Sequence, residues 1–187
     1  MKTPVSLLAR LREPNDKQAW DRFVELYTPM IWEWLRRLQL EPNDASDLLQ
    51  EVFVILLRKL PEFRYQRDGS FRGWLRTIVA NKHRDHLRRR LPTAIAAPEH
   101  FDNRQTPDPA EVFAEKEYRE LLVARALQLI QVDFQTVTWQ AFWDTTVREQ
   151  PAEAVAVRHG ISVNAVYLAK SRVLRRLREE LEGFLDE

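Results

Sequence analysis

The chain has 187 residues, of which 44% are hydrophobic and 30% are charged, and its formal net charge is only +1. This length fits one large domain or two small ones with a core in each. Because the chain has no cysteine, it can form neither a disulfide nor a thiolate metal site. The first residues lack the apolar segment of a signal peptide, and the longest strongly apolar run, residues 52–57, is far too short to span a bilayer. We therefore expect a cytoplasmic protein with no membrane partner.

Apolar residues recur at helical spacing through the first ninety positions, and four glycines in the whole chain are too few for an architecture rich in hairpins. The spacing predicts a helix capped by Asn15 or Asp16 and a second helix that starts after Pro29. The first of these helices is expected to bury Trp20, Phe23, Val24 and Tyr27. A third helix is expected from Pro42 to about residue 60, with Leu57 on its buried stripe. A loop follows over residues 61–70. These elements predict an all-α first domain over residues 1–90.

Residues 71–90 are typical of one helix with an apolar face and a basic face. The apolar face, which can be buried, comprises Phe71, Leu75, Ile78, Val79 and Leu87. The basic side chains expected in water, beside Trp74, are Arg72, Arg76, Lys82, Arg84, Arg88, Arg89 and Arg90. Cations hold phosphates, and an indole can stack on an unpaired base. This face is therefore typical of a protein that binds nucleic acid whose strands are being separated. The alternative is a solvated basic helix in which Trp74 is half buried.

The charge distribution supports the nucleic-acid interpretation, since residues 58–90 carry eleven basic and three acidic residues in a nearly neutral chain. No catalytic pattern accompanies it: a nucleophile–base set, paired carboxylates in a pocket context and a glycine-rich phosphate loop are all missing. We expect neither an enzyme nor a cofactor protein. His83 and His86 are spaced to touch one metal ion, but they lack a third ligand. We expect them to be exposed helix residues near phosphate rather than a metal site.

The second half of the chain predicts a linker and a second helical domain. Residues 91–110 contain four prolines among polar residues and are expected to be extended, with the second domain over residues 111–187. There Pro151 begins a short helix, Gly160 supplies a tight turn and Ser162 caps the next helix, as in a helix-turn-helix. The outward residues of this last helix and its cap are Ser162, Asn164, Tyr167, Lys170, Ser171, Arg172, Arg175 and Arg176. Asparagine can read adenine and arginine can read guanine or hold phosphate, so we expect this helix to bind DNA. The alternative is an ordinary amphipathic helix pair.

Two strings in this order carry a resemblance to a known family: DASDLLQEVF at residues 44–53, and FRGWL at residues 71–75 followed by Ile78, Asn81, Asp85 and Arg88. The first resembles a core-polymerase-binding helix and the second a promoter-melting and minus-ten helix. The chain thus resembles the bacterial RNA polymerase sigma factors of the small, two-domain extracytoplasmic-function (ECF) group. The resemblance spans about residues 20–181. It implies two small helical domains joined by an extended linker, and a transcription initiation factor with core RNA polymerase and promoter DNA as partners.

The resemblance also implies roles for particular residues. Asp47, Gln50 and Glu51 would face the polymerase and offer acceptors to basic residues there. Phe63 and Tyr65 would be the walls of a pocket for a flipped non-template base. The other expected minus-ten contacts are Arg72, Trp74, Arg76, Asn81, Lys82, Arg84 and Arg88. The helix-turn-helix would read the minus-thirty-five element.

Two other functions fit part of this pattern. A stand-alone helix-turn-helix transcriptional regulator would explain the C-terminal half, but it would leave the acidic face at Asp47 and the basic face of residues 71–90 without a task. A basic RNA-binding adaptor would bind single strands without promoter preference. The resemblance also allows an anti-sigma factor as a partner, which the sequence does not identify.

Overall fold

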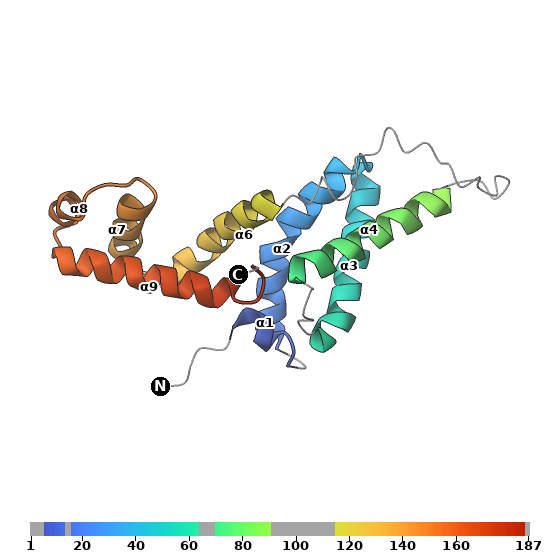
Figure 1. Ribbon diagram of the computed structural model, residues 1–187, viewed down its shortest axis with the longest axis horizontal. Helices are drawn as coiled ribbons and strands as arrows, with labels where there is room; N and C mark the ends of the chain where they lie inside the picture. Colours follow the sequence, from blue (N-terminus) through green and yellow to red (C-terminus); the bar gives the residue numbers. More distant parts are fainter. Residues whose placement is uncertain (1–5, 14–15, 64–69, 91–114, 186–187) are drawn as a thin grey trace. The chain divides into compact units, whose positions relative to one another are not determined.

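The computed structural model describes residues 6–13, 16–63, 70–90 and 115–185, and every regular element within these ranges is helical (Figure 1). The elements are α1 (Leu7–Arg10), α2 (Lys17–Arg37), α3 (Pro42–Lys59), η1 (Leu60–Glu62), α4 (Phe71–Arg90), α6 (Glu115–Ile130), η2 (Gln131–Asp133), α7 (Thr136–Thr146), α8 (Ala152–His159) and α9 (Val163–Leu181). The predicted all-α fold class is confirmed. Tyr65 and the predicted linker over residues 91–110 lie outside the described residues.

Contacts among the described residues group the chain into two compact units. The N-terminal unit takes in the described residues between Leu8 and Leu122 together with residues 183–185. The C-terminal unit takes in residues 6–7 and the segment Val123–Glu182. The division into residues 1–90, 91–110 and 111–187 stays a prediction, whereas the contacts assign the first turns of α6 and the end of the described chain to the N-terminal unit.

The first long helix, α2, is capped as predicted and runs further than predicted. Asp16 accepts a hydrogen bond from the backbone nitrogen of Ala19 at 2.9 Å and is held by the Arg10 guanidinium at 2.9 Å. The helix continues through Pro29, so the predicted break there is wrong. The side chains buried on either side of Pro29 are Leu26, Tyr27, Met30 and Ile31. These side chains fix both halves of α2 in one core. The energy gained by this packing therefore exceeds the cost of the backbone hydrogen bond that Pro29 cannot donate.

In the N-terminal unit α2 packs on α3, and α3 packs on α4. The buried side chains of these helices include Phe23, Trp34, Leu48, Val52, Leu56, Phe71, Leu75 and Val79. Three predicted core residues lie outside this core, since Val24 is 40% exposed, Leu57 is 55% exposed and Leu87 is 41% exposed. Leu57 is rotated by about 100° from the buried Leu56. Leu87 lies near the end of α4, where His83 takes the buried position instead.

Two distant parts of the chain complete this core. The hydroxyl of Tyr118, in the first turn of α6, donates to the backbone carbonyl of Phe184 at 2.8 Å and lies 2.9 Å from the hydroxyl of Tyr27. Since the Tyr118 proton is committed to that carbonyl, Tyr27 is the donor of the second bond. The Phe184 ring is fully buried and lies 4.9 Å from the ring of Phe71. The end of the described chain therefore packs against the first residue of α4.

The C-terminal unit is built around α9, against which both α7 and α8 pack. Its first cluster of buried residues joins α8 and α9 to α7 and comprises Ala141, Val155, Ala156, Val166 and Ala169. Gly160 has φ +63° and ends α8, and the Ser162 hydroxyl accepts from the backbone nitrogen of Ala165 at 3.1 Å. These are the turn and the cap that the sequence predicts, and Figure 1 shows α8 and α9 joined there.

Within the described ranges, none of the helices combines the length and the apolar character that crossing a membrane requires.

Candidate functional site

The first part of the candidate site is one face of α3. Asp47 and Gln50 are exposed, and within the described residues neither makes a hydrogen bond or an ion pair. Val54 and Leu57 follow them at helical spacing and are also exposed. A carboxylate, an amide and two uncovered aliphatic side chains therefore share this surface, which we call the α3 face. Sequence reasoning missed Val54 and placed Leu57 on the buried stripe, although Val54 lies four residues after Gln50 and Leu57 three residues after Val54, which is the spacing of one helix face.

Glu51 behaves differently from its neighbours on α3. Its carboxylate accepts from the Lys82 ammonium at 2.9 Å and from the Arg89 guanidinium at 3.3 Å, and both cations belong to α4. The bond from Lys82, followed by that from Arg89, lowers the pKa of Glu51 below its ordinary value. The structure thus joins a predicted polymerase contact, Glu51, to a predicted DNA contact, Lys82. Arg89 was predicted only as a solvated residue.

The two histidines of α4 face the protein rather than solvent. His83 is 3% exposed, and burial, with a smaller contribution from His86, lowers its pKa below the ordinary 6.5. His86 lies 3.7 Å from the Asp44 carboxylate of α3. The expectation of exposed histidines is therefore wrong for both residues, since only 14% of the His86 side chain is exposed and His83 is buried. The reason for His83 is its position one turn after the buried Val79, on the face of α4 that packs inward.

Trp74 lies on an aromatic support. Its ring centroid is 4.8 Å from that of Phe63 and 5.5 Å from that of Phe71, and both supporting rings are buried. Trp74 itself is partly exposed. The pocket role predicted for Phe63 and the strand contact predicted for Trp74 remain predictions. In the structure Phe63 lies under the indole of Trp74 rather than open to solvent.

The remaining predicted contacts on α4 divide into exposed and covered side chains. Asn81, Arg84 and Arg88 are exposed, and Arg76 is partly exposed. Arg84 donates to the amide oxygen of Asn81 at 2.5 Å, so these two present one joint polar group. Arg72 was expected in water, but only 19% of its side chain is exposed and it lies 3.9 Å from the Glu115 carboxylate. The first turn of α6 covers Arg72. The apolar periodicity of α4 alone could not predict a contact with another helix.

The second part of the candidate site is the outer face of α9. The predicted DNA contacts that are exposed are Ser162, Asn164, Tyr167, Ser171, Arg172 and Arg175, and Lys170 is partly exposed. Leu168 is exposed beside them and was missed. Arg176 is different, because it binds Asp133 at 2.9 Å and Glu180 at 2.7 Å. Its guanidinium holds α9 to η2 and is already neutralised by two carboxylates.

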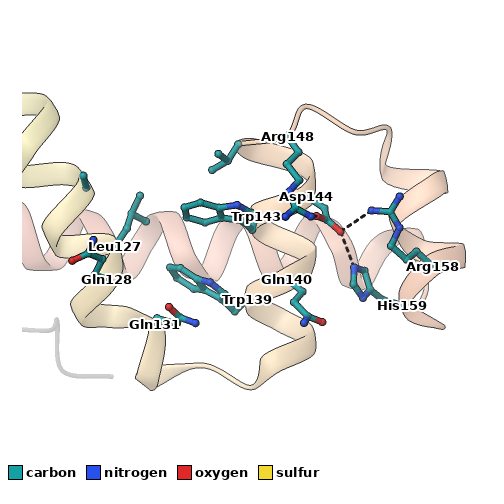
Figure 2. Close-up of a pocket in the computed structure, with 12 residues that line it drawn as sticks. Leu127, Gln128, Gln131, Trp139, Gln140, Trp143, Asp144, Arg148, Arg158 and His159 are labelled. Carbon is teal, nitrogen blue, oxygen red and sulfur yellow. Dashed lines mark hydrogen bonds and ion pairs between the residues drawn. The ribbon is translucent and has the colours of Figure 1, made fainter.

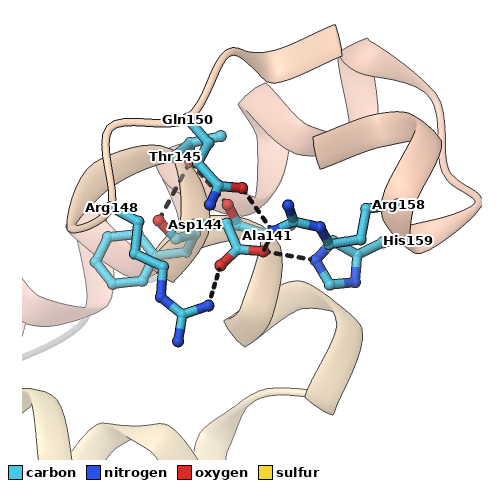
Figure 3. Close-up of polar contacts among 8 residues, drawn as sticks. Ala141, Asp144, Thr145, Arg148, Gln150, Arg158 and His159 are labelled. Carbon is cyan, nitrogen blue, oxygen red and sulfur yellow. Dashed lines mark hydrogen bonds and ion pairs between the residues drawn. The ribbon is translucent and has the colours of Figure 1, made fainter. Parts of the chain in front are cut away.

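A buried carboxylate of α7 binds the last turn of α8. Asp144 of α7 is 4% exposed and accepts from Arg148 at 2.9 Å, from Arg158 at 3.2 Å and from His159 at 2.9 Å (Figure 3). The bond from His159, then those from Arg158 and Arg148, lower the pKa of Asp144 below 3.8 against the opposing effect of burial. Arg158 and His159 form the last turn of α8, directly before Gly160. Sequence reasoning missed this network. Asp144 and Arg148 have the i, i+4 spacing of one helix, but Arg158 and His159 share no periodic pattern with them.

The same carboxylate lies at one end of a groove of about 690 Å³ in the C-terminal unit. Trp139 and Trp143 of α7 line it, and Leu127 faces them from the second half of α6 (Figure 2). Arg148 and His159 line its polar end. The groove contains none of the residues predicted to contact DNA, so it is separate from the outer face of α9.

Comparison with known proteins connects these surfaces to a family. The sigma-70 region 2 family model matches residues 23–91, which include all of α3 and α4. The ECF RNA polymerase sigma factor SigE of Mycolicibacterium smegmatis is 31% identical over 98 residues, 51% of this chain and 37% of that protein. The RNA polymerase sigma-H factor of Pseudomonas aeruginosa is 34% identical over 73 residues, 39% of this chain and 37% of that protein. These two alignments therefore span little more than a third of the relatives' own length.

A third relative is matched over most of its length. The RNA polymerase sigma factor CarQ of Myxococcus xanthus is 31% identical over 167 residues, 87% of this chain and 91% of that protein. A solved structure of CnrH in complex with the cytosolic domain of CnrY is 22% identical, with 91% of this chain and 92% of that chain covered and a TM-score of 0.38. On the alignment with CarQ and the match to region 2, the chain belongs to the RNA polymerase sigma factors, in their ECF group.

Proposed function

We propose that this protein is a transcription initiation factor that binds core RNA polymerase, directs it to specific promoters and assists DNA melting. One observation carries the proposal: adjacent helices of one unit present two unlike surfaces, the open α3 face and the basic, aromatic-bearing outer face of α4. The region 2 match covers both helices. The alignment with CarQ, over 87% of the chain, supports the same function for the remainder.

The proposed mechanism is binding rather than catalysis. The α3 face docks on the polymerase, and the outer face of α9 sets the register on the upstream duplex. Trp74, on its support of Phe63 and Phe71, and the cations of α4 then hold the melted strand. Unstacking a base costs a few kcal/mol, and the favourable contacts of the two units offset this cost. The polymerase performs the chemistry, so the protein itself needs no catalytic residues.

The proposal places the protein in the cytoplasm, where polymerase and promoter are. An anti-sigma factor that covered the α3 face would compete directly with the polymerase. The exposed aliphatic side chains Val54 and Leu57 suit that face to a protein partner, because uncovered apolar side chains gain most when a partner excludes water from them.

Co-elution with core RNA polymerase on gel filtration tests the proposal. The wild-type chain is expected to co-elute stoichiometrically, and Asp47→Arg is expected to abolish co-elution. Asp47 suits this purpose because no partner among the described residues depends on it. Asp21→Arg, an equal charge change at an exposed position of α2, is the matched control and should co-elute normally. Failure of the wild-type chain to co-elute with an active cognate core would refute the function.

A stand-alone helix-turn-helix regulator makes the opposite prediction. Such a protein binds its duplex site without polymerase and as a dimer, because paired half-sites mirror a two-fold axis. Sedimentation of the chain with duplexes selected from genomic DNA separates the two functions. We expect a monomer that selects its duplex only when core polymerase is present.

A further inference from the structure

We propose that Lys82 and Arg89 form a phosphodiester-binding site for the DNA strand, and that Glu51 occupies this site in the free protein as an internal substitute for the phosphate. The presence of an internal occupant rests on the geometry of α3 and α4 alone. Its role in initiation rests on the function proposed above.

The geometry is that of two cations around one anion. Lys82 and Arg89 are seven residues apart on α4, so they project from the same side of the helix two turns apart. One oxygen of the Glu51 carboxylate binds Lys82 at 2.9 Å and the other binds Arg89 at 3.3 Å. A phosphodiester offers the same arrangement, a single negative charge shared by two oxygens. The two cations can therefore exchange the carboxylate for a phosphate without changing their own positions on the helix.

The exposure of the three side chains allows that exchange. The side chain of Lys82 is 22% exposed, that of Glu51 is 35% exposed and that of Arg89 is 61% exposed. Ion pairs with this much solvent contact contribute little free energy, so a strand that brings several phosphates can displace the carboxylate. The remaining exposed cations of α4, Arg84 and Arg88, have no carboxylate partner among the described residues. They can hold neighbouring phosphates of the same strand, Arg84 by exchanging its bond to the amide oxygen of Asn81 for one to phosphate.

The position of Glu51 couples the two surfaces. It lies one residue after Gln50 and one turn after Asp47, at the edge of the α3 face. A basic partner residue that binds Glu51 from that side releases Lys82 and Arg89 toward the strand. In the free protein the internal ion pairs instead reduce binding to DNA that the polymerase has not engaged.

Fluorescence anisotropy with a labelled twenty-nucleotide thymidine strand at low salt, without polymerase, tests the inference. Glu51→Gln should bind about three- to tenfold more tightly than wild type, as expected when two part-exposed ion pairs no longer compete with phosphate. Asp47→Asn makes the same change in net charge on the same helix and has no internal partner. It should change the affinity by less than about twofold, since an exposed charge acts only through screened solvent.

A double-mutant cycle then assigns the gain to the site. In the Lys82→Gln, Arg89→Gln background, Glu51→Gln should give no gain. Equal gains from Glu51→Gln and Asp47→Asn, or a gain that persists without the two cations, would overturn the inference. So would a failure of Glu51→Gln to bind the strand more tightly than wild type. Glu51→Ala also removes the negative charge and should raise strand affinity in the same direction. Circular dichroism checks that each variant is folded.

Co-elution of wild type with core polymerase is scored separately from the anisotropy. Strand binding that rises in Glu51→Gln without any polymerase binding by wild type would support the internal phosphate substitute and refute the initiation function. Polymerase binding by wild type, with no gain in strand binding by Glu51→Gln, would support the initiation function and refute the internal phosphate substitute.

Discussion

His83 is the buried titratable residue of α4, and its environment gives the N-terminal unit a defined response to pH. Burial, followed by the nearby His86, lowers its pKa below 6.5. The unfolded chain therefore takes up a proton at a pH where the folded chain does not. The stabilising effect is complete above about pH 6.5 and is lost as the pH falls toward the folded-state pKa.

We expect the unfolding temperature of wild type to decrease between about pH 7.5 and pH 5.5, by an amount equivalent to at most about 1.4 kcal/mol for each pH unit below 6.5. His83→Gln removes the titrating group and should flatten this dependence. The measurement is thermal unfolding followed by circular dichroism. Gln50→Ala, at an exposed position of the same unit, is the control and should keep the wild-type pH dependence. A pH dependence that survives in His83→Gln would assign it to another group.

At the scale of elements, Asp144 joins α7 to the end of α8, and its bonds to Arg158 and His159 fix the helix that precedes the Gly160 turn. Its lowered pKa means that this stabilisation is present at every pH above about 3.8 and is lost only as the pH falls further. The turn and the cap of the helix-turn-helix were predictable, since Gly160 and Ser162 have local conformational preferences. The Asp144 network was not, because it depends on how α7 crosses α8.

Asp144→Asn should lower the stability of the C-terminal unit by about 2 kcal/mol, since it weakens three bonds at a buried position. Arg148→Ala removes only the partner that follows α7 in the chain, whose side chain is 60% exposed, and should have a smaller effect. Denaturant unfolding measures both. The Asn variant should also weaken duplex binding by the polymerase complex while leaving co-elution with core polymerase intact. Equal stability of the two variants would contradict the role given to Asp144.

The packing of Phe184, at the end of the described chain, is a second feature that no local sequence pattern could predict. Phe184 and Tyr118 are far in sequence from Tyr27 and Phe71, yet the four side chains share one core. Helical periodicity correctly indicated which side chains of α2 and α4 are apolar and inward, but it carries no information on what covers them. The predicted break at Pro29 fails for the same reason, because packing from both sides outweighs a local preference.

Phe184→Ala should destabilise the N-terminal unit by about 3–5 kcal/mol, as a fully buried aromatic leaves a large cavity. Phe184→Leu, which keeps most of the buried volume, should be markedly milder. Chemical denaturation followed by tryptophan fluorescence measures both. Val132→Ala, at a position that is 83% exposed, is the control. If Phe184→Ala unfolds at the wild-type denaturant concentration, the end of the chain is not part of this core.

At the scale of the whole molecule, the proposed function assigns recognition of duplex DNA to one unit and recognition of the melted strand to the other. The polar and basic face of α9 suits a duplex, where base edges and phosphates are read together. The aromatic support of Trp74 and the cations of α4 suit a strand whose bases are unstacked. Under the proposed function, variants in the two units should therefore fail at different steps of initiation rather than weaken one common step.

The two steps can be separated with a promoter duplex and the same duplex with its minus-ten segment already mismatched. Arg172→Ala should weaken binding of the polymerase complex to both templates about equally, because its contact precedes opening. Trp74→Ala should impair opening of the matched duplex, followed by permanganate reactivity of unpaired thymines, and should recover substantially on the mismatched template because the unstacking step is already complete. Trp74→Phe keeps a ring on the support of Phe63 and Phe71 and should retain most of the opening. If Trp74→Ala also loses polymerase binding, Trp74 acts through the core of the N-terminal unit and not through the strand.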